Sequence, residues 1–374
     1  MNFIGIDLHT NRFTCCYRNE QSSVENPTKG RDIKTFDLNT EGLAKFFHTL
    51  TGDTYVLVEA TITTFSFVKL FQDKVKEIII ANTYELKQVS LARCNTDKID
   101  ADKLSRILKA QVLSGEQLVS PVVIPPEKIQ DLRGLFTTYR LYKKQSTQLK
   151  NRIHSLLKER LFGFTQEEIF DKKNRERIRN ISTDTALHFQ LNQLIDRLER
   201  DELDVDKLKE QIQLQAESYM LQIEILTSMK GVSVFIAIAI IADIIDVSRF
   251  KNSKAFTSYL RSAPKVSNSN TSVKIRGTNK KGRKLSATLL TQSLHHVMNS
   301  SCKLQRWYDR LCEYKKPGLV RTGLRRRVLA EIFQMLKKGE YHYWRDSLNH
   351  ENKMLQYRRF LEKQKNMNTL KKIA

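Results

Sequence analysis

Short apolar runs of strand length alternate with amphipathic stretches near the start of the chain. The strand-like runs cover residues 3–6, 13–17, 33–38, 54–59 and 77–81. Residues 41–50 and 65–72 instead place apolar side chains on one face of a helix. Strands that alternate with helices are typical of an α/β domain with a mixed or parallel sheet. We therefore expect such a domain in this part of the chain.

The period of the pattern changes to that of a helix from Asp100 onward. Residues 115–126, with prolines at three positions, predict a loop. A long helix is expected next, because apolar residues recur there at helical spacing. These residues are Ile129, Leu132, Phe136, Tyr139, Tyr142, Leu149, Ile153, Leu156 and Leu157.

A heptad repeat follows this helix. Its positions lie seven residues apart and are Leu191, Leu198, Val205, Ile212, Tyr219 and Leu226. Polar residues interrupt the intermediate positions at Asp201, Gln215 and Gln222. Such a seam is typical of a coiled coil that joins two chains. A helical hairpin packed within one chain has the same pattern, and both structures stay open at this point.

The pattern predicts a second, mainly α-helical domain in the last third of the chain. It begins near Leu226 and contains a small apolar helix over 232–245. Residues 262–278 are rich in serine and asparagine and predict a loop. Helices that carry Trp307, Tyr308 and the arginine run 325–327 follow. The tail 346–374 is basic, and a charged helix and a disordered segment both fit it.

Charge narrows the class of partner. The chain has 374 residues and a formal net charge of +23, from 64 lysines and arginines against 41 acids. Such a surplus favours a polyanionic partner, because each phosphate that is neutralised releases counterions. No apolar run approaches the roughly 20 residues that cross a bilayer. We therefore expect a nucleic-acid partner and no membrane-spanning segment.

The cysteines and the first residues indicate the compartment. The five cysteines show no CxxC or histidine-paired metal spacing, so we expect free thiols, as in a reducing cytosol. Asp7 and His9 interrupt the stretch where a signal peptide needs an apolar core. The expected location is the cytoplasm.

Four carboxylates have the order and spacing of a metal site. Asp7 and Glu59 each end an apolar, strand-like run. Asp97 and Asp100 are three residues apart, so on a helix they share one face. Converging oxygen ligands suit Mg²⁺ or Mn²⁺ and serve metal-assisted phosphoryl transfer. Each acid taken alone would more often be a cap or a surface residue, and it is the order and spacing together that favour the metal site.

Two sets of motifs run in order along the chain. The first set is FIGIDLHTNRFTCCY, LVEAT, CNTDKIDADKLSRIL and LKNRIHSLL. The second set is MKGVSVFIAIAIIADI, SRFKNSKAFTSYLRSAPKVSNSN and GTNKKGRKL. Together they resemble the DEDD transposases of the IS110 insertion-sequence family, which are related to the RuvC resolvase. The resemblance covers roughly residues 3–336 and is weak in the middle.

The resemblance implies a fold and a domain order. It implies an RNase-H-like (RuvC-like) α/β catalytic domain over residues 1–160, which includes a basic helix from about residue 127. A helical coiled-coil or linker region over 161–225 and a C-terminal transposase domain over 226–345 would follow, with the basic tail 346–374 at the end. The residues that it implies as catalytic metal ligands are Asp7, Glu59, Asp97 and Asp100.

The resemblance also implies a serine nucleophile. In the family, a serine about five residues after an Ala-Pro pair forms a covalent link to DNA, and Ala263-Pro264 puts that serine at Ser269. Ser267 and Ser272 lie nearby and are alternatives. The chain departs from the family pattern at three positions, which are Ile62, Asn95 and Asn270 in place of Gly, Lys and Gly.

Basic residues gather in two segments that could follow a phosphate backbone. The first set is Arg133, Arg140, Lys143, Lys144, Lys150 and Arg152. The second set is Lys274, Arg276, Lys280, Lys281, Arg283 and Lys284. A solvated charged face is the alternative for each segment. The spacing of Tyr139 and Tyr142 favours core packing over base stacking.

The sequence has no helix-turn-helix or zinc-finger signature that would read DNA directly. The resemblance implies instead that a structured non-coding bridge RNA supplies specificity, by the general logic of RNA-guided recognition. We expect a DNA transposase or recombinase that acts as a dimer or dimer of dimers in the prokaryotic cytoplasm, at the nucleoid. The alternatives are a Piv-type site-specific invertase, a RuvC-like junction nuclease and a non-catalytic nucleic-acid-binding derivative.

Overall fold

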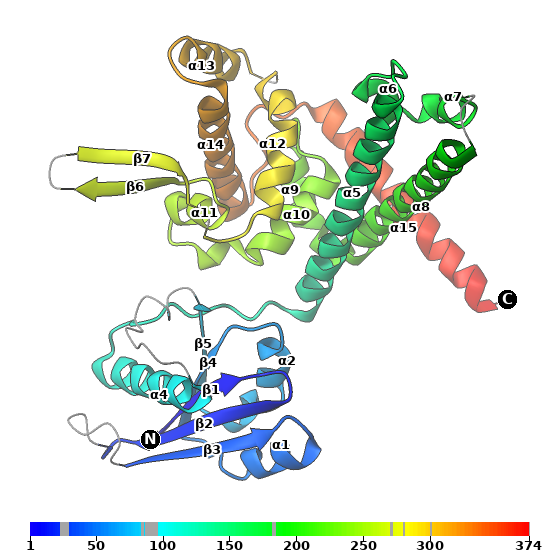
Figure 1. The fold of residues 1–374 in the computed structure, drawn as a ribbon. Helices are drawn as coiled ribbons and strands as arrows, with labels where there is room; N and C mark the ends of the chain where they lie inside the picture. The colour runs from blue at the N-terminus through cyan, green and yellow to red at the C-terminus, as the bar shows by residue number, and fades with distance from the viewer. Residues whose placement is uncertain are drawn as a thin grey trace. The chain divides into compact units, whose positions relative to one another are not determined.

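The structure is a computed structural model that divides into two units, Met1–Ile124 and Pro125–Ala374 (Figure 1). It describes residues 1–22, 30–83, 86, 96–181, 185–269, 272–279, 281–299 and 301–373. The side chains of residues 265–269, 272–276 and 368–373 are outside this description.

The first unit is built on a mixed sheet, as the alternating pattern predicted. Its elements are β1 (Asn2–Leu8), β2 (Arg12–Asn19), β3 (Arg31–Asp37), α1 (Thr40–Phe47), β4 (Thr54–Glu59), α2 (Thr64–Lys69), η1 (Gln72–Lys74), β5 (Glu77–Ala81) and α4 (Asp97–Ser114). The strand order is β3-β2-β1-β4-β5. β1, β4 and β5 are parallel, while β2 is antiparallel to both of its neighbours.

Apolar residues cover both faces of this sheet. Ile4 and Ile6 of β1 pack with Phe46 of α1 and Phe67 of α2 on one face. On the other face Phe3 packs in a cluster with residues of α4. Burial on both faces explains why β1 and β4 are nearly continuous apolar runs and not alternating ones.

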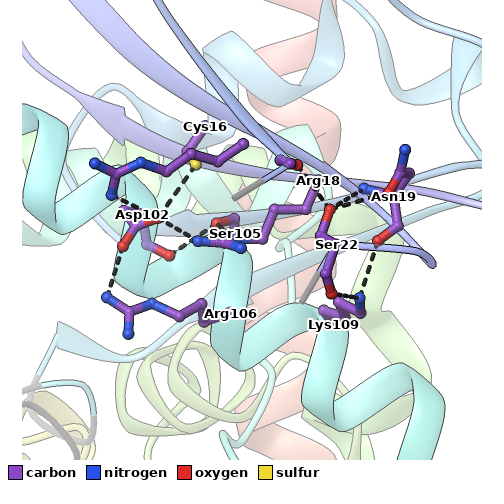
Figure 2. A network of polar contacts seen from close by, with 10 residues as sticks. Cys16, Arg18, Asn19, Ser22, Asp102, Ser105, Arg106 and Lys109 are labelled. Carbon is purple, nitrogen blue, oxygen red and sulfur yellow. Dashed lines mark hydrogen bonds and ion pairs between the residues drawn. The ribbon is translucent and has the colours of Figure 1, made fainter. Parts of the chain in front are cut away.

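A buried polar network holds α4 against β2 (Figure 2). The Asp102 carboxylate accepts hydrogen bonds from Arg18 at 2.5 Å and from Arg106 at 2.6 Å. Arg18 also donates to Ser105 Oγ at 3.0 Å. One turn further along, Lys109 Nζ donates to the carbonyls of Asn19, Glu20 and Ser22 at 2.8–3.0 Å. These contacts set the position of α4 along the sheet.

The second unit is mostly helical. Its elements are α5 (Glu127–Glu159), α6 (Gln166–Phe170), η2 (Lys172–Asn174), α7 (Arg175–Arg179), α8 (Thr185–Gln215), η3 (Glu217–Tyr219), α9 (Met220–Thr227), α10 (Val234–Ile244), η4 (Val247–Arg249), α11 (Ser253–Tyr259), β6 (Pro264–Ser269), β7 (Ser272–Thr278), α12 (Leu285–Met298), α13 (Cys302–Cys312), α14 (Pro317–Lys338) and α15 (Ser347–Ile373). The basic helix that we grouped with the N-terminal domain is α5, which packs against α8 and α10 in this unit.

The part of the heptad seam on α8 is buried within the chain, in agreement with the second of the two structures that the pattern left open. Leu191 and Leu198 of α8 pack in a cluster with Ile153 and Leu156 of α5. Further along α8, Val205 and Ile212 are buried in a second cluster of the same unit. The helical hairpin within one chain is therefore the structure that these residues adopt.

Two further expectations from the pattern have a clear outcome. The predicted loop 262–278 is instead an antiparallel hairpin, in which β6 pairs with β7. The basic tail forms α15, the helical alternative, and buries Met354, Tyr357 and Leu361 at helical spacing. Among the described helices, none has a long enough apolar stretch to traverse a bilayer.

Candidate active site

The first two predicted ligands lie at the carboxyl ends of two neighbouring strands, β1 and β4. β1 and β4 are parallel and pair Ile6 with Val58, so Asp7 and Glu59 come next on each strand. Side chains alternate along a strand. Because Phe3 and Leu57 belong to the cluster that contains α4 residues, Asp7 and Glu59 share the face of the sheet that α4 covers.

Gly5 determines how closely α4 approaches this edge. A Cβ atom on Gly5 would overlap the backbone nitrogen of Ser105 and the backbone oxygen of Ala101. The helix backbone therefore lies directly on β1, two residues before Asp7. Asp97 lies one turn before Ala101 on α4 and Asp100 lies directly before it, so this contact places the first turn of the helix near Asp7.

Asp7, His9 and Asp97 have their ligand atoms close together. The His9 Nε2 atom lies 3.1 Å from Asp7 Oδ2 and 3.3 Å from Asp97 Oδ1. One ligand atom from each of the three residues lies within 4.8 Å of the others. The side chains of Asp7 and Asp97 are 14% and 31% exposed, so the cluster is half-sheltered from water.

Basic side chains surround the carboxylates. Arg12 donates to Asp97 Oδ2 at 2.9 Å, and Lys103 donates to Asp100 Oδ1 at 2.8 Å. Burial raises the pKa of Asp7, and the charges of Asp100 and Asp97 raise it further, against the effect of His9. The pKa of Asp97 is lowered, because His9 and Arg12 outweigh the effect of burial. Three carboxylates thus meet at this place, and Arg12 and Lys103 neutralise part of their charge.

The structure brings some of the predicted ligands closer together than others. Asp7 and Asp97 belong to the tight cluster, and Asp100 is near enough to raise the pKa of Asp7. Glu59 lies outside the tight group that the described residues form, on the strand next to Asp7. His9 was not among the ligands expected from the sequence. Its signal was an Asp-x-His spacing at the end of a strand, which becomes meaningful only once the turn to β2 is formed.

The donor set fits a divalent cation. Carboxylate oxygens are the ligands that Mg²⁺ and Mn²⁺ prefer, and an imidazole nitrogen is accepted more readily by the softer of the two. The arrangement has no cysteine, which argues against a thiolate-type zinc site. Cys15, Cys16, Cys302 and Cys312 are free thiols, as expected, and Cys94 lies outside the described residues.

Ser269 ends β6 and is paired with Ser272 across the hairpin. Ser267 is paired with Lys274. The side chains of these four residues are outside the description, as is all of Asn270. The root of the hairpin is well anchored, because Asn279 donates its backbone N–H to the Ala263 carbonyl at 2.9 Å.

The basic residues of α5 separate into two groups. Arg140, Lys143, Lys144 and Arg152 are exposed. Arg133 instead donates to the carbonyls of Ala242 and Asp243 at 2.7 and 3.1 Å, and burial lowers its pKa to about 10. Lys150 forms an ion pair with Glu202 at 2.9 Å. The last two residues are therefore engaged within the unit.

The second basic set is described only in part. Lys281 and Lys284 are exposed, and Arg283 is half-buried. The side chains of Lys274 and Arg276, and all of Lys280, lie outside the described residues. Tyr139 is buried in the core cluster of the second unit, as its spacing predicted.

Two family models match the chain. The model of the IS110-type DEDD transposases matches residues 4–161, a range that contains all four predicted metal ligands. The model described as the transposase IS116/IS110/IS902 family matches residues 223–309, which contain Ser269. No curated protein matches the chain.

Proposed function

The chain belongs to the IS110 family of DEDD transposases, and on that basis we propose how its residues divide the work of cutting and rejoining DNA. The metal ligands are Asp7, Glu59, Asp97 and Asp100, in the proposed RuvC-like catalytic domain 1–160. The nucleophile is Ser269, in the domain 226–345. The observation that carries the proposal is the approach of Asp97 to Asp7 at the edge of the sheet, through His9.

The residues of the proposed metal centre either bind the cation or hold its ligands in place. Asp7 and Asp97 would hold Mg²⁺ or Mn²⁺, together with Glu59 and Asp100. A bound cation would polarise the scissile phosphate and stabilise the charge of the leaving oxygen. Arg12 and Lys103 hold the side chains of Asp97 and Asp100 in place by hydrogen bonds. We add His9 to the ligands, because its Nε2 atom is within 3.3 Å of both Asp7 and Asp97.

Ser269 would conserve the energy of the phosphodiester bond. Its Oγ atom forms a bond to phosphorus as the bond to the departing DNA oxygen breaks, and the hydroxyl proton passes to that oxygen. One phosphoester replaces another, so rejoining the DNA needs no external energy source. Ser267 and Ser272 stay as alternatives on the same hairpin.

Substitution of Asp97 and Ser269 tests this division. Asp97→Asn should abolish strand cleavage and weaken Mn²⁺ binding measured by calorimetry. Ser269→Ala should abolish strand cleavage, the covalent protein–DNA adduct and strand transfer, but leave Mn²⁺ binding unchanged. Asp53→Asn is the matched control, because that side chain is 58% exposed and ends no apolar strand. Adduct formation that persists in Ser269→Ala and is lost in Ser267→Ala or Ser272→Ala would move the nucleophile to that serine.

His9 can be tested without any turnover. Mn²⁺ bound to the unsubstituted protein should show a ¹⁴N coupling by electron paramagnetic resonance, and His9→Ala should remove it. A spectrum that is the same in both proteins would mean that His9 only spaces the two carboxylates.

A structured RNA partner and an oligomer complete the proposal. What supports the RNA is the family together with the lack of a direct-readout motif in the sequence. Recombination also joins two duplexes, so we propose a dimer or a dimer of dimers. Light scattering of the protein with RNA transcribed from the DNA beside its gene tests both. A monomer that binds this RNA no better than an unrelated transcript would contradict both proposals.

A further inference from the structure

A hollow of about 570 Å³ lies in the second unit, at the root of the β6–β7 hairpin, whose first strand ends at Ser269. Residues of α11, α13 and α14 line it, together with Ala263 and Pro264 at the start of β6. Its volume is in the range of small-molecule sites, roughly 300–1,000 Å³. The side chains that give it chemical character are Lys254, Trp307, Arg326 and Arg327.

Two small residues of α14, Gly323 and Ala330, line this hollow together with Arg327. Gly323, Arg327 and Ala330 are spaced by four and three residues, so they share one face of the helix. A Cβ atom on Gly323 would meet Trp307 Cη2 at 3.7 Å, which shows that the indole lies against the glycine. An alanine at this position would make an ordinary van der Waals contact with the ring. Arg327 lies with its guanidinium carbon 5.7 Å from the centroid of the same ring.

The three arginines 325–327 of α14 have different surroundings. Arg325 donates to Ser262 Oγ at 3.0 Å, to Thr291 Oγ1 at 2.9 Å and to the Arg261 carbonyl at 3.2 Å. Burial lowers the pKa of Arg325. The hydrogen bond from Arg325 holds Ser262, the residue before Ala263, in place. Arg326 and Arg327 are exposed and line the hollow instead.

The lining combines an aromatic ring with positive charge. Among the described residues that line the hollow, three are cations and none is an acid. Outside the lining, Glu331 offsets part of this charge, at 3.6 Å from Arg327. An indole offers a surface on which a base can stack, and guanidinium groups bind phosphate in a fixed geometry. This pairing selects a nucleotide over an uncharged apolar ligand.

We propose that the hollow binds one unpaired nucleotide of the DNA strand that Ser269 attacks, with the base on Trp307 and a phosphate on Arg326 and Arg327. The proposal rests on the function proposed for Ser269. That serine is five residues beyond Pro264 on an extended strand, which corresponds to about 17 Å of chain. The bound nucleotide would therefore lie a short distance along the DNA strand from the scissile phosphate. Its binding would keep that phosphate positioned for attack by Ser269.

Tryptophan fluorescence tests the proposal directly. The chain has two tryptophans, Trp307 and Trp344, so Trp344→Phe leaves Trp307 as the single emitter. In EDTA, where no cleavage takes place, a single-stranded DNA oligonucleotide should quench this emission, and a fully paired duplex of the same sequence should not. Trp307→Ala should weaken binding of the single strand by about tenfold, as expected for the loss of one stacked base.

Charge variants on α14 provide the matched control. Arg326→Ala and Arg327→Ala should each weaken single-strand binding, measured by fluorescence anisotropy. Arg321→Ala removes the same charge from the same helix outside the hollow and should change the affinity little. An equal loss in all three variants would overturn the assignment to the hollow.

Three other results would overturn the proposal. They are unchanged Trp307 emission when anisotropy shows saturation with DNA, equal quenching by the paired duplex, and stronger quenching by an RNA of the same sequence. The single-tryptophan titration remains decisive if Trp307→Ala fails to fold. If DNA does not quench Trp307 emission but the protein still carries out strand transfer, only the assignment to the hollow is refuted. If DNA quenches Trp307 emission but the protein carries out no strand transfer, the proposed function is refuted.

Discussion

Asp97 and Asp102 are five residues apart on α4, and their surroundings give them different roles. Asp97 is partly exposed beside Asp7 and His9, where a cation can reach it. Asp102 is 2% exposed and accepts hydrogen bonds from two arginines, so its role is to hold α4 in place. Their spacing in the sequence does not distinguish them. The difference comes from which side of α4 meets β1 and which meets β2.

Asp102→Ala should destabilise the protein strongly. The substitution leaves Arg18 buried without its carboxylate, and breaking such a pair costs about 3–5 kcal/mol. Urea denaturation at neutral pH measures this loss. The control is Asp97→Ala, whose partners remain solvated and whose effect should stay below about 1 kcal/mol. Equal losses for the two variants would mean that Asp97 is also structural.

At the scale of the elements, the α5–α8 hairpin shows how an apolar stripe finds its partner. Leu198 is 1% exposed and packs in the cluster with Ile153 and Leu157 of α5. The stripe on α8 is therefore satisfied by a helix of the same chain. A heptad repeat specifies an apolar face, but it does not specify which helix covers that face.

Leu198→Ala should lower the stability of the fold and leave the oligomeric state unchanged. Truncation of a buried leucine costs about 2–5 kcal/mol, because a cavity remains. Thermal melting and light scattering on the same samples measure the two effects. The matched variant is Leu203→Ala on the same helix, where the side chain is 58% exposed and the loss should be small. Dissociation of an oligomer at unchanged stability would restore the intermolecular seam.

A charged cluster around Glu202, in the middle of α8, makes stability depend on pH. Glu202 of α8 pairs with Arg175 at 2.5 Å and with Lys150 at 2.9 Å. Burial opposes its ionisation, yet Arg175 and Lys150 lower the pKa of Glu202 to about 2. Because the folded pKa is below the unfolded one, this stabilisation is present above about pH 4.5 and is lost as the pH falls toward 2.

Glu202→Gln should therefore be less stable than the unsubstituted protein at pH 7, by on the order of 3 kcal/mol. The gap should shrink as the pH is lowered through 4 and 3. Urea denaturation at each pH gives the comparison. Glu176→Gln, at a side chain that is 79% exposed, serves as the control and should show no such trend. A gap that is constant with pH would contradict the ion-pair origin.

At the scale of the whole molecule, the net charge of +23 favours binding to nucleic acid. Association should weaken steeply with salt, since each phosphate contact releases counterions. The exposed cations of α5 are the ones expected to take part, and Arg133 and Lys150 are not, because internal partners hold them.

Arg140→Ala and Lys144→Ala should each lower the slope of log K against log salt by about 1. Fluorescence anisotropy with a duplex at several salt concentrations measures the slope. Lys150→Ala lies on the same helix and should leave the slope unchanged while lowering stability through the loss of its pair with Glu202. A reduced slope in Lys150→Ala would show that the ion pair opens to bind phosphate.

Much of the fold and of the candidate site follows from local pattern. The strands of the first unit, the long helix α5 and the apolar helix α10 were predicted within a few residues, because burial on one or both faces leaves a period in the sequence. The family predicted from the ordered motifs is confirmed by the two family models. The sequence by itself thus determined most of the elements, the order of the acids and the family.

Only the tertiary structure decided which residues meet. His9 joined Asp7 and Asp97 because the turn after β1 and the close contact at Gly5 bring two distant segments together. Hairpin pairing of 264–278 and the division of the arginine run were likewise invisible in the sequence. The physical reason is common to these cases. A local period records that a face is buried or a charge is present, whereas the partner of that face or charge is chosen by contacts between residues far apart in the chain.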